Sequence, residues 1–260
     1  MISDAQVARF NADGYVLIKA LLDKDETELL RREARKDPAI ATHAVDREDG
    51  EGGKSRITLW NEAGDDFFGM ISRSERVVNA MERFLDGEVY HYHSKMMQKE
   101  PFKGGAWIWH QDYGYWYKNG CLFPYMASCF IAVDPCTREN GCLQVLRGSH
   151  LMGRIEHIQV AGQTGADPER TKEAEKILEK VYVEMEPGDA LIFHCNLLHR
   201  SDQNTSPNPR WALICCYNAA RNNPYKESGH PRYTPLVKVA DSAIKQAGER
   251  VLNEGLQFLR

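Results

Sequence analysis

The sequence lacks the features that would place a protein at a membrane, on nucleic acid or outside the cell. No run approaches the roughly 20 apolar residues of a bilayer-spanning helix, and the first residues, MISDAQVARF, are polar and acidic, unlike a secretory signal. The 33 basic and 37 acidic residues leave a formal net charge of -4, which gives no general attraction to phosphate backbones. We therefore expect a cytoplasmic protein with a small-molecule partner and no nucleic-acid or membrane partner.

Paired cysteines are lacking as well. The 7 cysteines are odd in number, form no CxxC motif and lie mostly in apolar segments, a usage typical of reduced thiols in a core. Disulfides and a structural zinc cluster are therefore not expected. The chain also shows no internal repeat and no low-complexity linker, and its 42% of hydrophobic residues can fill a sizeable core. We expect a single domain over residues 1–260.

The first third of the chain reads as mainly helical. Residues 3–35 predict a helix capped by Ser3, a strand in YVLIKALL and a second helix in DKDETELLRREARKD. Residues 36–65 are polar and glycine-rich and predict a mobile loop, and residues 66–86 return to a helical spacing of apolar side chains. Residues 1–87 thus form a helix-rich N-terminal part.

The rest of the chain predicts short strands. Between residues 88 and 225, β-like runs such as MASCFIAVD, DALIFHCNLLH and WALICCYNAA are separated by proline and glycine, and only PERTKEAEKILEKVYV reads as a helix. A tail over residues 226–260 ends in a helical segment that starts near residue 238. Short strands at regular spacing favour a β-sandwich or jelly roll with flanking helices over a parallel sheet.

Two segments carry residues that can bind a metal. In WIWHQDYGYWY, His110 and Asp112 are two residues apart, so on an extended backbone their side chains point to the same side. In EPGDALIFHCNLLHRS, an apolar strand is followed by two candidate third ligands, His194 and His199. Two histidines and one carboxylate form the ligand set of non-haem Fe(II) oxygenases, and zinc is the competing metal.

Arg210 follows His199 by eleven residues, at the start of the apolar run RWALICCYN. A guanidinium in such a run is costly to bury without an anionic partner. It either pairs bidentately with the carboxylate of a ligand or makes a salt bridge to an internal Asp or Glu, and the residue alone does not decide between the two.

Together these motifs resemble the phytanoyl-CoA dioxygenase family of Fe(II)/2-oxoglutarate-dependent oxygenases. The resemblance covers roughly residues 8–225, from FNADGYVLIKALL through the H-x-D motif, NGCLQVLRGSH and PGD…LLH-x-S to Arg210. Among its members, YHYHSKMMQKEP and RWALICCYNAARN are most similar to ectoine hydroxylase-like proteins. The resemblance implies a mainly β fold with flanking helices, a double-stranded β-helix or cupin-like jelly roll.

The resemblance also implies roles for individual residues. It places Fe(II) on His110, Asp112 and His199 as the catalytic metal centre, which leaves His194 as a supporting or core residue. It places 2-oxoglutarate on Arg210, Lys95 and Ser128, with dioxygen as the second cosubstrate and ascorbate as a candidate reductant. Because halogenating relatives replace the carboxylate of the triad, Asp112 favours hydroxylation, with release of succinate and carbon dioxide. Desaturation, cyclisation and demethylation start in the same way and stay open.

The aromatic residues around the H-x-D motif indicate which kind of substrate the protein binds. Trp116 and Tyr115 can form a wall against a cationic or zwitterionic metabolite. Trp116 stands where ectoine hydroxylases have a pocket tryptophan, whereas His93 replaces their substrate-contacting glutamine. His93 and Arg221 are further candidates for a substrate carboxylate. The expected function is hydroxylation of an unactivated C–H bond in a small polar or zwitterionic metabolite.

Three alternatives remain at this level. An acyl-CoA hydroxylase would need a basic entrance, for which only Arg138, Arg147 and Arg154 are available near the motifs. A non-catalytic cupin-like protein could keep the metal site for binding alone, and a zinc hydrolase could use the same triad. The oligomeric state stays open.

Overall fold

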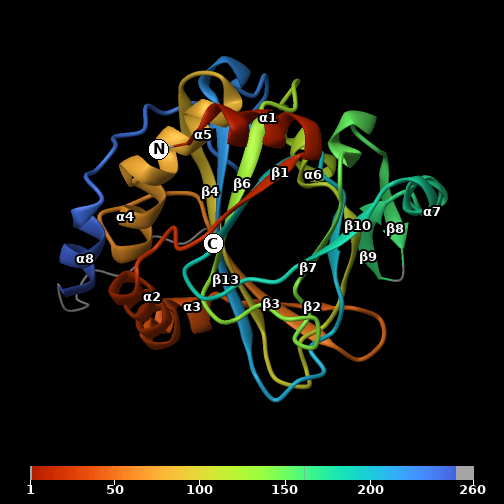
Figure 1. Ribbon diagram of the computed structural model, residues 1–260, viewed down its shortest axis with the longest axis horizontal. Coiled ribbons are helices and arrows are strands. Elements are labelled where there is room, and N and C mark those ends of the chain that lie inside the picture. Colours follow the sequence, from red (N-terminus) through yellow and green to blue (C-terminus); the bar gives the residue numbers. More distant parts are fainter. Residues whose placement is uncertain (1, 161, 250–260) are drawn as a thin grey trace.

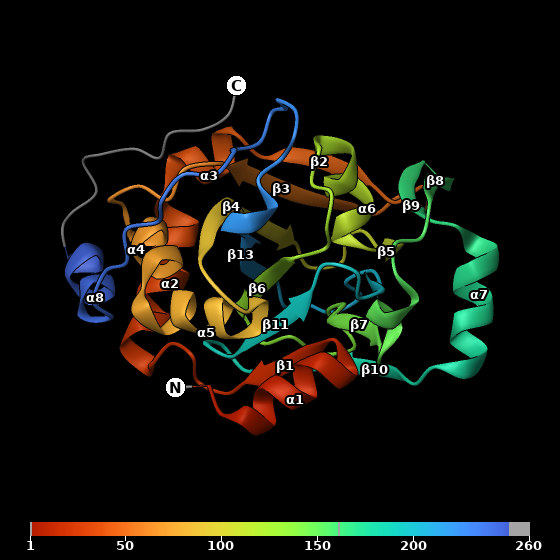
Figure 2. The same ribbon diagram turned by 90° about the horizontal axis from the view of Figure 1, so that it is seen from above.

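Two antiparallel sheets face each other, and a small hairpin lies beside them (Figures 1 and 2). The computed structural model describes residues 2–160 and 162–249. The larger sheet has the order β1 (Tyr15–Ile18), β11 (Ala190–His194), β6 (Met126–Ala132), β13 (Arg210–Ala219), β4 (Val89–Lys99), β3 (Lys54–Trp60) and β2 (Val45–Glu48). The smaller sheet has the order β10 (Lys180–Val183), β7 (Leu143–Leu146), β12 (His199–Ser201) and β5 (Trp107–His110). The hairpin consists of β8 (His157–Val160) and β9 (Gln163–Ala166).

Most of the helices lie on the outer face of the larger sheet (Figure 1). These are α1 (Asp4–Asp13), α2 (Lys24–Lys36), α3 (Pro38–Thr42), α4 (Phe67–Arg73), α5 (Glu75–Leu85) and α8 (Ser242–Glu249). Elsewhere the described residues form α6 (Asp112–Trp116), α7 (Pro168–Ile177) and 3₁₀ turns at Tyr117–Asn119, Ser149–Met152 and Ala220–Asn222. Ser3 and Asp23 begin α1 and α2 with capping boxes. No helix among the described residues has the length and apolar character needed to cross a membrane.

The fold has two main apolar cores, one on each side of the larger sheet. The outer core packs buried side chains of α4 and α5, such as Ile71 and Met81, against those of β6 and β13, such as Ile131 and Leu213. The inner core lies between the two sheets and contains side chains from β4, β6, β7, β11 and β13. Because its central strands β11, β6, β13 and β4 are buried on both faces, the larger sheet is a rigid support for the residues that point into the space between the sheets.

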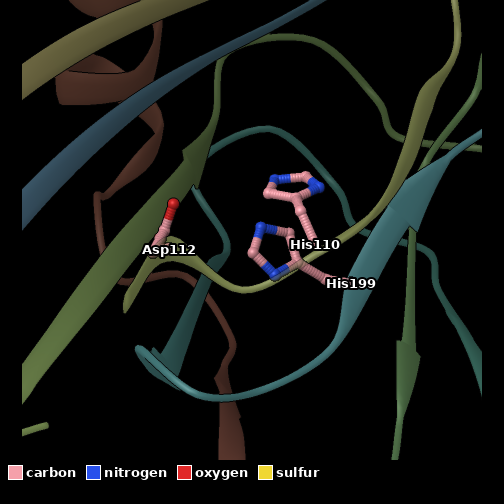
Figure 3. Close-up of side chains that lie close together, drawn as sticks. All are labelled: His110, Asp112 and His199. Carbon is pink, nitrogen blue, oxygen red and sulfur yellow. The ribbon is translucent and has the colours of Figure 1, made fainter. Parts of the chain in front are cut away.

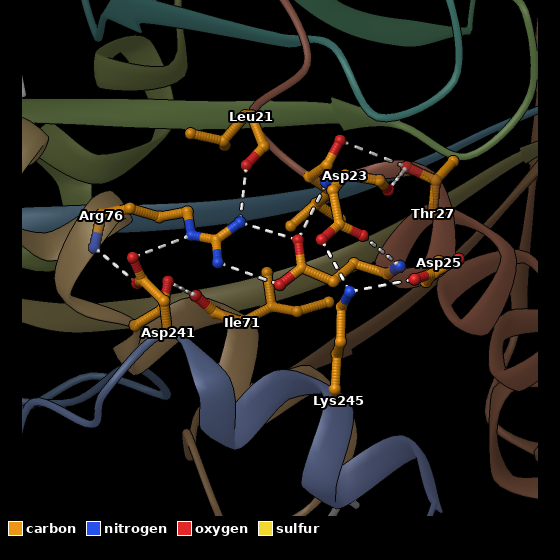
Figure 4. A network of polar contacts seen from close by, with 11 residues as sticks. Leu21, Asp23, Asp25, Thr27, Ile71, Arg76, Asp241 and Lys245 are labelled. Atoms are coloured by element: carbon orange, nitrogen blue, oxygen red, sulfur yellow. Dashed lines mark hydrogen bonds and ion pairs between the residues drawn. The ribbon is translucent and has the colours of Figure 1, made fainter.

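An ion-pair network joins the C-terminal helix to the N-terminal helices (Figure 4). Arg76 of α5 contacts Glu26 of α2 at 2.7 Å and Asp241, directly before α8, at 3.2 Å. It also donates a hydrogen bond to the carbonyl oxygen of Leu21 at 2.9 Å. Lys245 of α8 adds a contact to Asp23 at 2.8 Å. Asp241 and Lys245 therefore anchor the segment that follows β13 on the helical layer.

Most of the expected elements are confirmed, but two segments are corrected. Residues 36–65 are not a loop: they contain α3 and the hairpin of β2 and β3, and β3 pairs with β4. Because β4 is distant in sequence, this pairing makes a strand of a segment whose polar composition alone is typical of a loop. The helix expected over PERTKEAEKILEKVYV ends at Ile177, and β10 follows it. Of the tail helix, α8 starts at Ser242, and residues 250–260 lie outside the described part of the chain.

Candidate active site

Three side chains from two neighbouring strands and one helix meet between the sheets (Figure 3). His110 ends β5 and His199 begins β12, and the two residues are direct partners across these antiparallel strands. The backbone stays extended through Gln111 and then turns into α6, whose first residue is Asp112. One donor atom from each of the three side chains lies within 4.8 Å of the others. The side chains of the H-x-D pair thus converge as expected, although Asp112 itself is helical.

The hydrogen bonds of both imidazoles fix their tautomers. Nδ1 of His110 lies 2.8 Å from the carbonyl oxygen of Ile108, and Nδ1 of His199 lies 2.9 Å from that of Leu197. Because a carbonyl only accepts, Nδ1 carries the proton in each ring and Nε2 keeps a free lone pair. Burial, together with the proximity of the two rings, lowers the pKa of His110, and burial lowers the pKa of His199. Neutral rings with a free Nε2 are what metal ligation requires.

The Asp112 carboxylate is held by two polar side chains of the larger sheet. Ser128 of β6 donates a hydrogen bond to Oδ2 at 2.8 Å, and Nζ of Lys95 on β4 lies 3.4 Å from Oδ1. Burial raises the pKa of Asp112, but the charge of Lys95 and the Ser128 hydrogen bond favour the ionised form, and the pKa lies below its usual value. The carboxylate is therefore ionised and oriented. Lys95 and Ser128 were expected beside the cosubstrate. In the structure, both contact the carboxylate of Asp112.

The donor set fits iron better than structural zinc. Among the described residues, these three form the only group of at least three His, Cys, Asp or Glu side chains placed to hold a metal ion. Two imidazoles and one carboxylate occupy one face of an octahedron and leave the other face open, which suits non-haem Fe(II). No thiolate joins the group, and all seven cysteines are free and buried, as expected from the sequence.

Arg210 begins β13 and reaches the same space, and it has no ion-pair partner among the residues that the structure describes. Its Nη2 donates a hydrogen bond to the carbonyl oxygen of Gly141 at 2.9 Å, while its Nε has no partner. The side chain is 2% exposed, and no described carboxylate lies within 4.0 Å of it. The alternative of an internal salt bridge is therefore not supported by the described residues. An unpaired buried guanidinium can receive the carboxylate of a ligand.

A cavity of about 660 Å³ contains the triad and most of the expected binding residues. Arg210, Lys95, His93, Tyr115 and Trp116 line it. Trp116 is buried and stands edge-on to His93, with ring centroids 5.6 Å apart. These side chains therefore surround the space next to the metal site, which is large enough for 2-oxoglutarate and a small second molecule.

Arg221 is a correction to the sequence-based expectation. Its guanidinium donates hydrogen bonds to the carbonyl oxygens of Asp86 and Leu85 at 2.6 and 2.7 Å, at the C-terminal end of α5, and stacks on Tyr125. It is not among the residues that line the cavity. Carbonyls at a helix C-terminus attract a cation, so Arg221 is a structural cap.

Several cavity residues were missed by the sequence reasoning, among them Arg47 and His230. Arg47 lies on β2, in the segment expected to be a loop, and His230 lies in an irregular segment after β13. Neither belongs to a motif, so only its position in three dimensions identifies it. His194 is outside the triad, as expected: its ring lies beside those of His150 and Phe10, with centroids 5.4 and 6.2 Å away.

The fold and the site define a double-stranded β-helix oxygenase with a two-histidine, one-carboxylate centre. The family model of phytanoyl-CoA dioxygenase matches residues 10–212, and the chain belongs to this family. L-proline trans-4-hydroxylase from Streptomyces griseoviridis is 28% identical, over 92% of this chain and 93% of the relative. Ectoine dioxygenase from Bordetella parapertussis is 27% identical, over 89% of this chain and 80% of the relative.

Solved structures agree with the sequence relatives. EctD from S. alaskensis with bound Fe is 27% identical, with a TM-score of 0.74 over 87% of this chain and 80% of that one. A second structure of EctD, with 2-oxoglutarate and 5-hydroxyectoine, has a TM-score of 0.73 and covers 92% and 85% of the two chains. The expected fold and family are confirmed, and so is the expectation of a dioxygenase that uses iron and 2-oxoglutarate.

Proposed function

We propose that this dioxygenase hydroxylates an unactivated C–H bond of a small zwitterionic metabolite at a centre formed by His110, Asp112 and His199. The observation that carries the proposal is the combination of three converging ligand atoms with the unpaired guanidinium of Arg210 in one cavity. The named activities of the relatives, on L-proline and on ectoine, support a small polar substrate.

Each residue has a distinct task in this proposal. Bound Fe(II) supplies the activation of dioxygen, coupled to the conversion of 2-oxoglutarate into succinate and carbon dioxide. His110 and His199 present Nε2 lone pairs, and Asp112 presents an ionised oxygen. Arg210 binds the distal carboxylate of 2-oxoglutarate. Ser128 and Lys95 hold Asp112 in orientation, and Lys95 also lines the cavity beside the cosubstrate.

The substrate occupies the remaining space, which is lined by His93, Tyr115 and Trp116. The aromatic rings exclude water from the reacting carbon and limit which C–H bond approaches the metal. Because Asp112 fills the carboxylate position, we infer hydroxylation as the outcome. A cytoplasmic location stays a prediction, supported by the seven free cysteines.

The alternatives have less support. Arg138, Arg147 and Arg154, the basic residues considered for coenzyme A, each form an ion pair, with Glu184, Glu179 and Glu156 respectively. Their charges are therefore compensated, which disfavours an acyl-CoA entrance. A binding protein without turnover has no use for an open metal face and an unpaired guanidinium together.

Succinate formation tests the proposal. The protein is incubated with Fe(II), ascorbate and 2-oxoglutarate, with and without L-proline, ectoine and a panel of amino acids. We expect succinate that a substrate increases, and its loss in His199→Ala but not in His150→Ala, a histidine outside the cavity. Hydrolysis of a substrate without succinate formation, supported by Zn(II) as well as by Fe(II), would indicate the hydrolase instead, and metal binding without any turnover would indicate the binding protein.

A further inference from the structure

His230 reaches the cavity from the segment that follows β13. The segment between Asn223 and Ala240 contains no helix and no named strand, and it lies beyond residues 10–212, which the family model matches. The carbonyl oxygen of Gly229 accepts a hydrogen bond from Nδ2 of Asn61 at 2.8 Å, and the Tyr233 hydroxyl donates one to Glu88 at 2.6 Å. His230 is therefore held in place on both sides rather than lying on a free end.

The ring of His230 packs against two rings of β4. Its centroid is 5.1 Å from that of Tyr92, in a stacked arrangement, and 5.0 Å from that of His93. His93 is 1% exposed, and within the described part of the chain neither of its ring nitrogens has a hydrogen-bond partner. Nδ1 of His230 is also buried without a partner. Both residues line the cavity, so three sheltered nitrogen atoms lie at one part of its wall.

Unpartnered buried nitrogens indicate what a ligand has to supply. A buried polar atom without a hydrogen bond costs stability unless a ligand or water pairs with it. Burial lowers the pKa of both rings, so each imidazole is neutral and offers one N–H donor and one lone pair. A ligand that fits both rings must therefore carry a hydrogen-bond acceptor and a donor close together.

The charges around the cavity favour a carboxylate as the acceptor. Lys95 is balanced by Asp112, and Arg200 is balanced by Asp202. Asp46 and Glu48, which also line the cavity, are balanced by Arg56 and Lys54 respectively. With Fe(II) and the 2-oxoglutarate dianion bound, the positive charges of Arg210 and the metal exceed the remaining negative charge. The filled site is therefore net positive, which attracts a substrate that carries an anionic group.

We propose that His93 and His230 together bind the head group of an α-amino or α-imino acid substrate. The N–H of one imidazole donates to the substrate carboxylate, and the lone pair of the other accepts from the substrate nitrogen. This assignment rests on the proposed hydroxylase function and narrows it to a substrate class. It makes His230 a specificity-determining residue outside the matched family region.

The first test compares head groups. Succinate formation and substrate hydroxylation are measured with the common L-amino acids and L-proline, and the most effective compound is compared with its carboxamide and its N-acetyl derivative. We expect both derivatives to raise KM at least about tenfold, since each removes a charged hydrogen-bonding partner. Stimulation by compounds without a carboxylate, such as amides, at equal or lower KM would overturn the head-group assignment.

The second test compares variants. His230→Phe keeps the stacked ring and removes the nitrogens, His230→Gln retains a donor and an acceptor, and His150→Phe is the control, because His150 also has an unpartnered buried Nδ1 but does not line the cavity. We expect His230→Phe to raise the KM for the best amino acid about 10- to 100-fold, His230→Gln to recover part of it, and the control to resemble the native protein. The KM for the cosubstrate and the succinate formed without substrate stay at their native values in the His150→Phe control.

Binding provides a readout independent of turnover. The affinity of the same amino acid for the anaerobic Fe(II)–2-oxoglutarate protein is measured by calorimetry and is expected to fall in His230→Phe by the same factor as KM rises. Native affinity in that variant overturns the proposal. If succinate forms in the native protein but no amino acid increases it, the head-group assignment fails and the oxygenase function stands. If no succinate forms under any condition, the proposed function itself fails.

Discussion

Replacing Arg210 separates a ligand-binding role from a structural one. Arg210→Met removes a guanidinium that has no carboxylate partner among the described residues and donates one hydrogen bond to Gly141. In the native protein, the proposed contacts of this guanidinium to the distal carboxylate of 2-oxoglutarate are two charged hydrogen bonds, each worth about 1.5–3 kcal/mol. Losing about 3 kcal/mol or more raises the KM for this cosubstrate at least about 100-fold, because about 1.4 kcal/mol corresponds to a factor of ten.

The stability of the same variant is expected to change little. The lost hydrogen bond to Gly141 costs about 1 kcal/mol. Burial disfavours the charged form of Arg210 and lowers its pKa, so removing the buried charge in the variant offsets this cost. Without cosubstrate, the free energy of unfolding of Arg210→Met should therefore remain within about 2 kcal/mol of the native value. Removing one partner of a buried ion pair would instead cost about 3–5 kcal/mol.

Two assays and two further variants complete this test. Denaturant unfolding of the metal-free protein gives the free energy, and initial rates of succinate formation give the KM. Arg210→Lys keeps the charge without the two-pronged geometry and should give an intermediate KM. Arg221→Met, outside the cavity, should lower stability through the lost cap of α5 and leave the KM unchanged. A large loss of stability in Arg210→Met with an unaltered KM would refute the reasoning.

Three further changes test the support of the metal site and the buried histidines. Ser128→Ala removes the hydrogen bond to Asp112 and should weaken iron binding about 10- to 100-fold by calorimetry; an effect on the cosubstrate KM alone would instead favour the contact expected from the sequence. Gly114→Ala places a Cβ 2.1 Å from His157 and should destabilise the protein by about 1–3 kcal/mol in thermal unfolding, with weaker iron binding because α6 shifts; native values for both would show that the helix absorbs the methyl group. Burial lowers the pKa of His91 from 6.5 to about 4, so the neutral ring contributes fully to stability above pH 6.5, and this contribution is lost as the pH falls toward 4. Between pH 7 and 5, the free energy of unfolding of the native protein should therefore drop by about 2 kcal/mol more than that of His91→Gln. Parallel pH curves for the two proteins would contradict this.

The sequence predicts the chemical centre better than its surroundings. Asp112 follows His110 by two residues at the end of β5, and Arg210 follows His199 by eleven residues, from the start of β12 to the start of β13. Both spacings are short enough to be read in the sequence, whereas the pairing of β5 with β12 that joins them is a tertiary contact. Arg221 looked equivalent in sequence, but which carbonyl groups a guanidinium reaches depends on how α5 ends nearby. Local sequence cannot give that information.

Residues of irregular or weakly patterned segments were beyond prediction for a related reason. β2 is exposed at all four positions, so it has no alternation of polar and apolar residues, and its strand state depends on pairing with β3. His230 has no periodic neighbours at all. Its position depends on hydrogen bonds to residues more than a hundred positions away in sequence. Such contacts come from tertiary structure and leave no local pattern.

The pairing of His110 with His199 has a mechanical consequence. β5 is an edge strand with β12 as its one partner in the sheet, and an edge strand of four residues has few main-chain hydrogen bonds to hold it. An ion bound by both histidines would link these strands as a crosslink does. Trp107, on the same strand, forms part of the cavity wall. Loading with metal would therefore stiffen one side of the compartment in which the organic ligands bind, so metal is expected to precede them in the order of assembly.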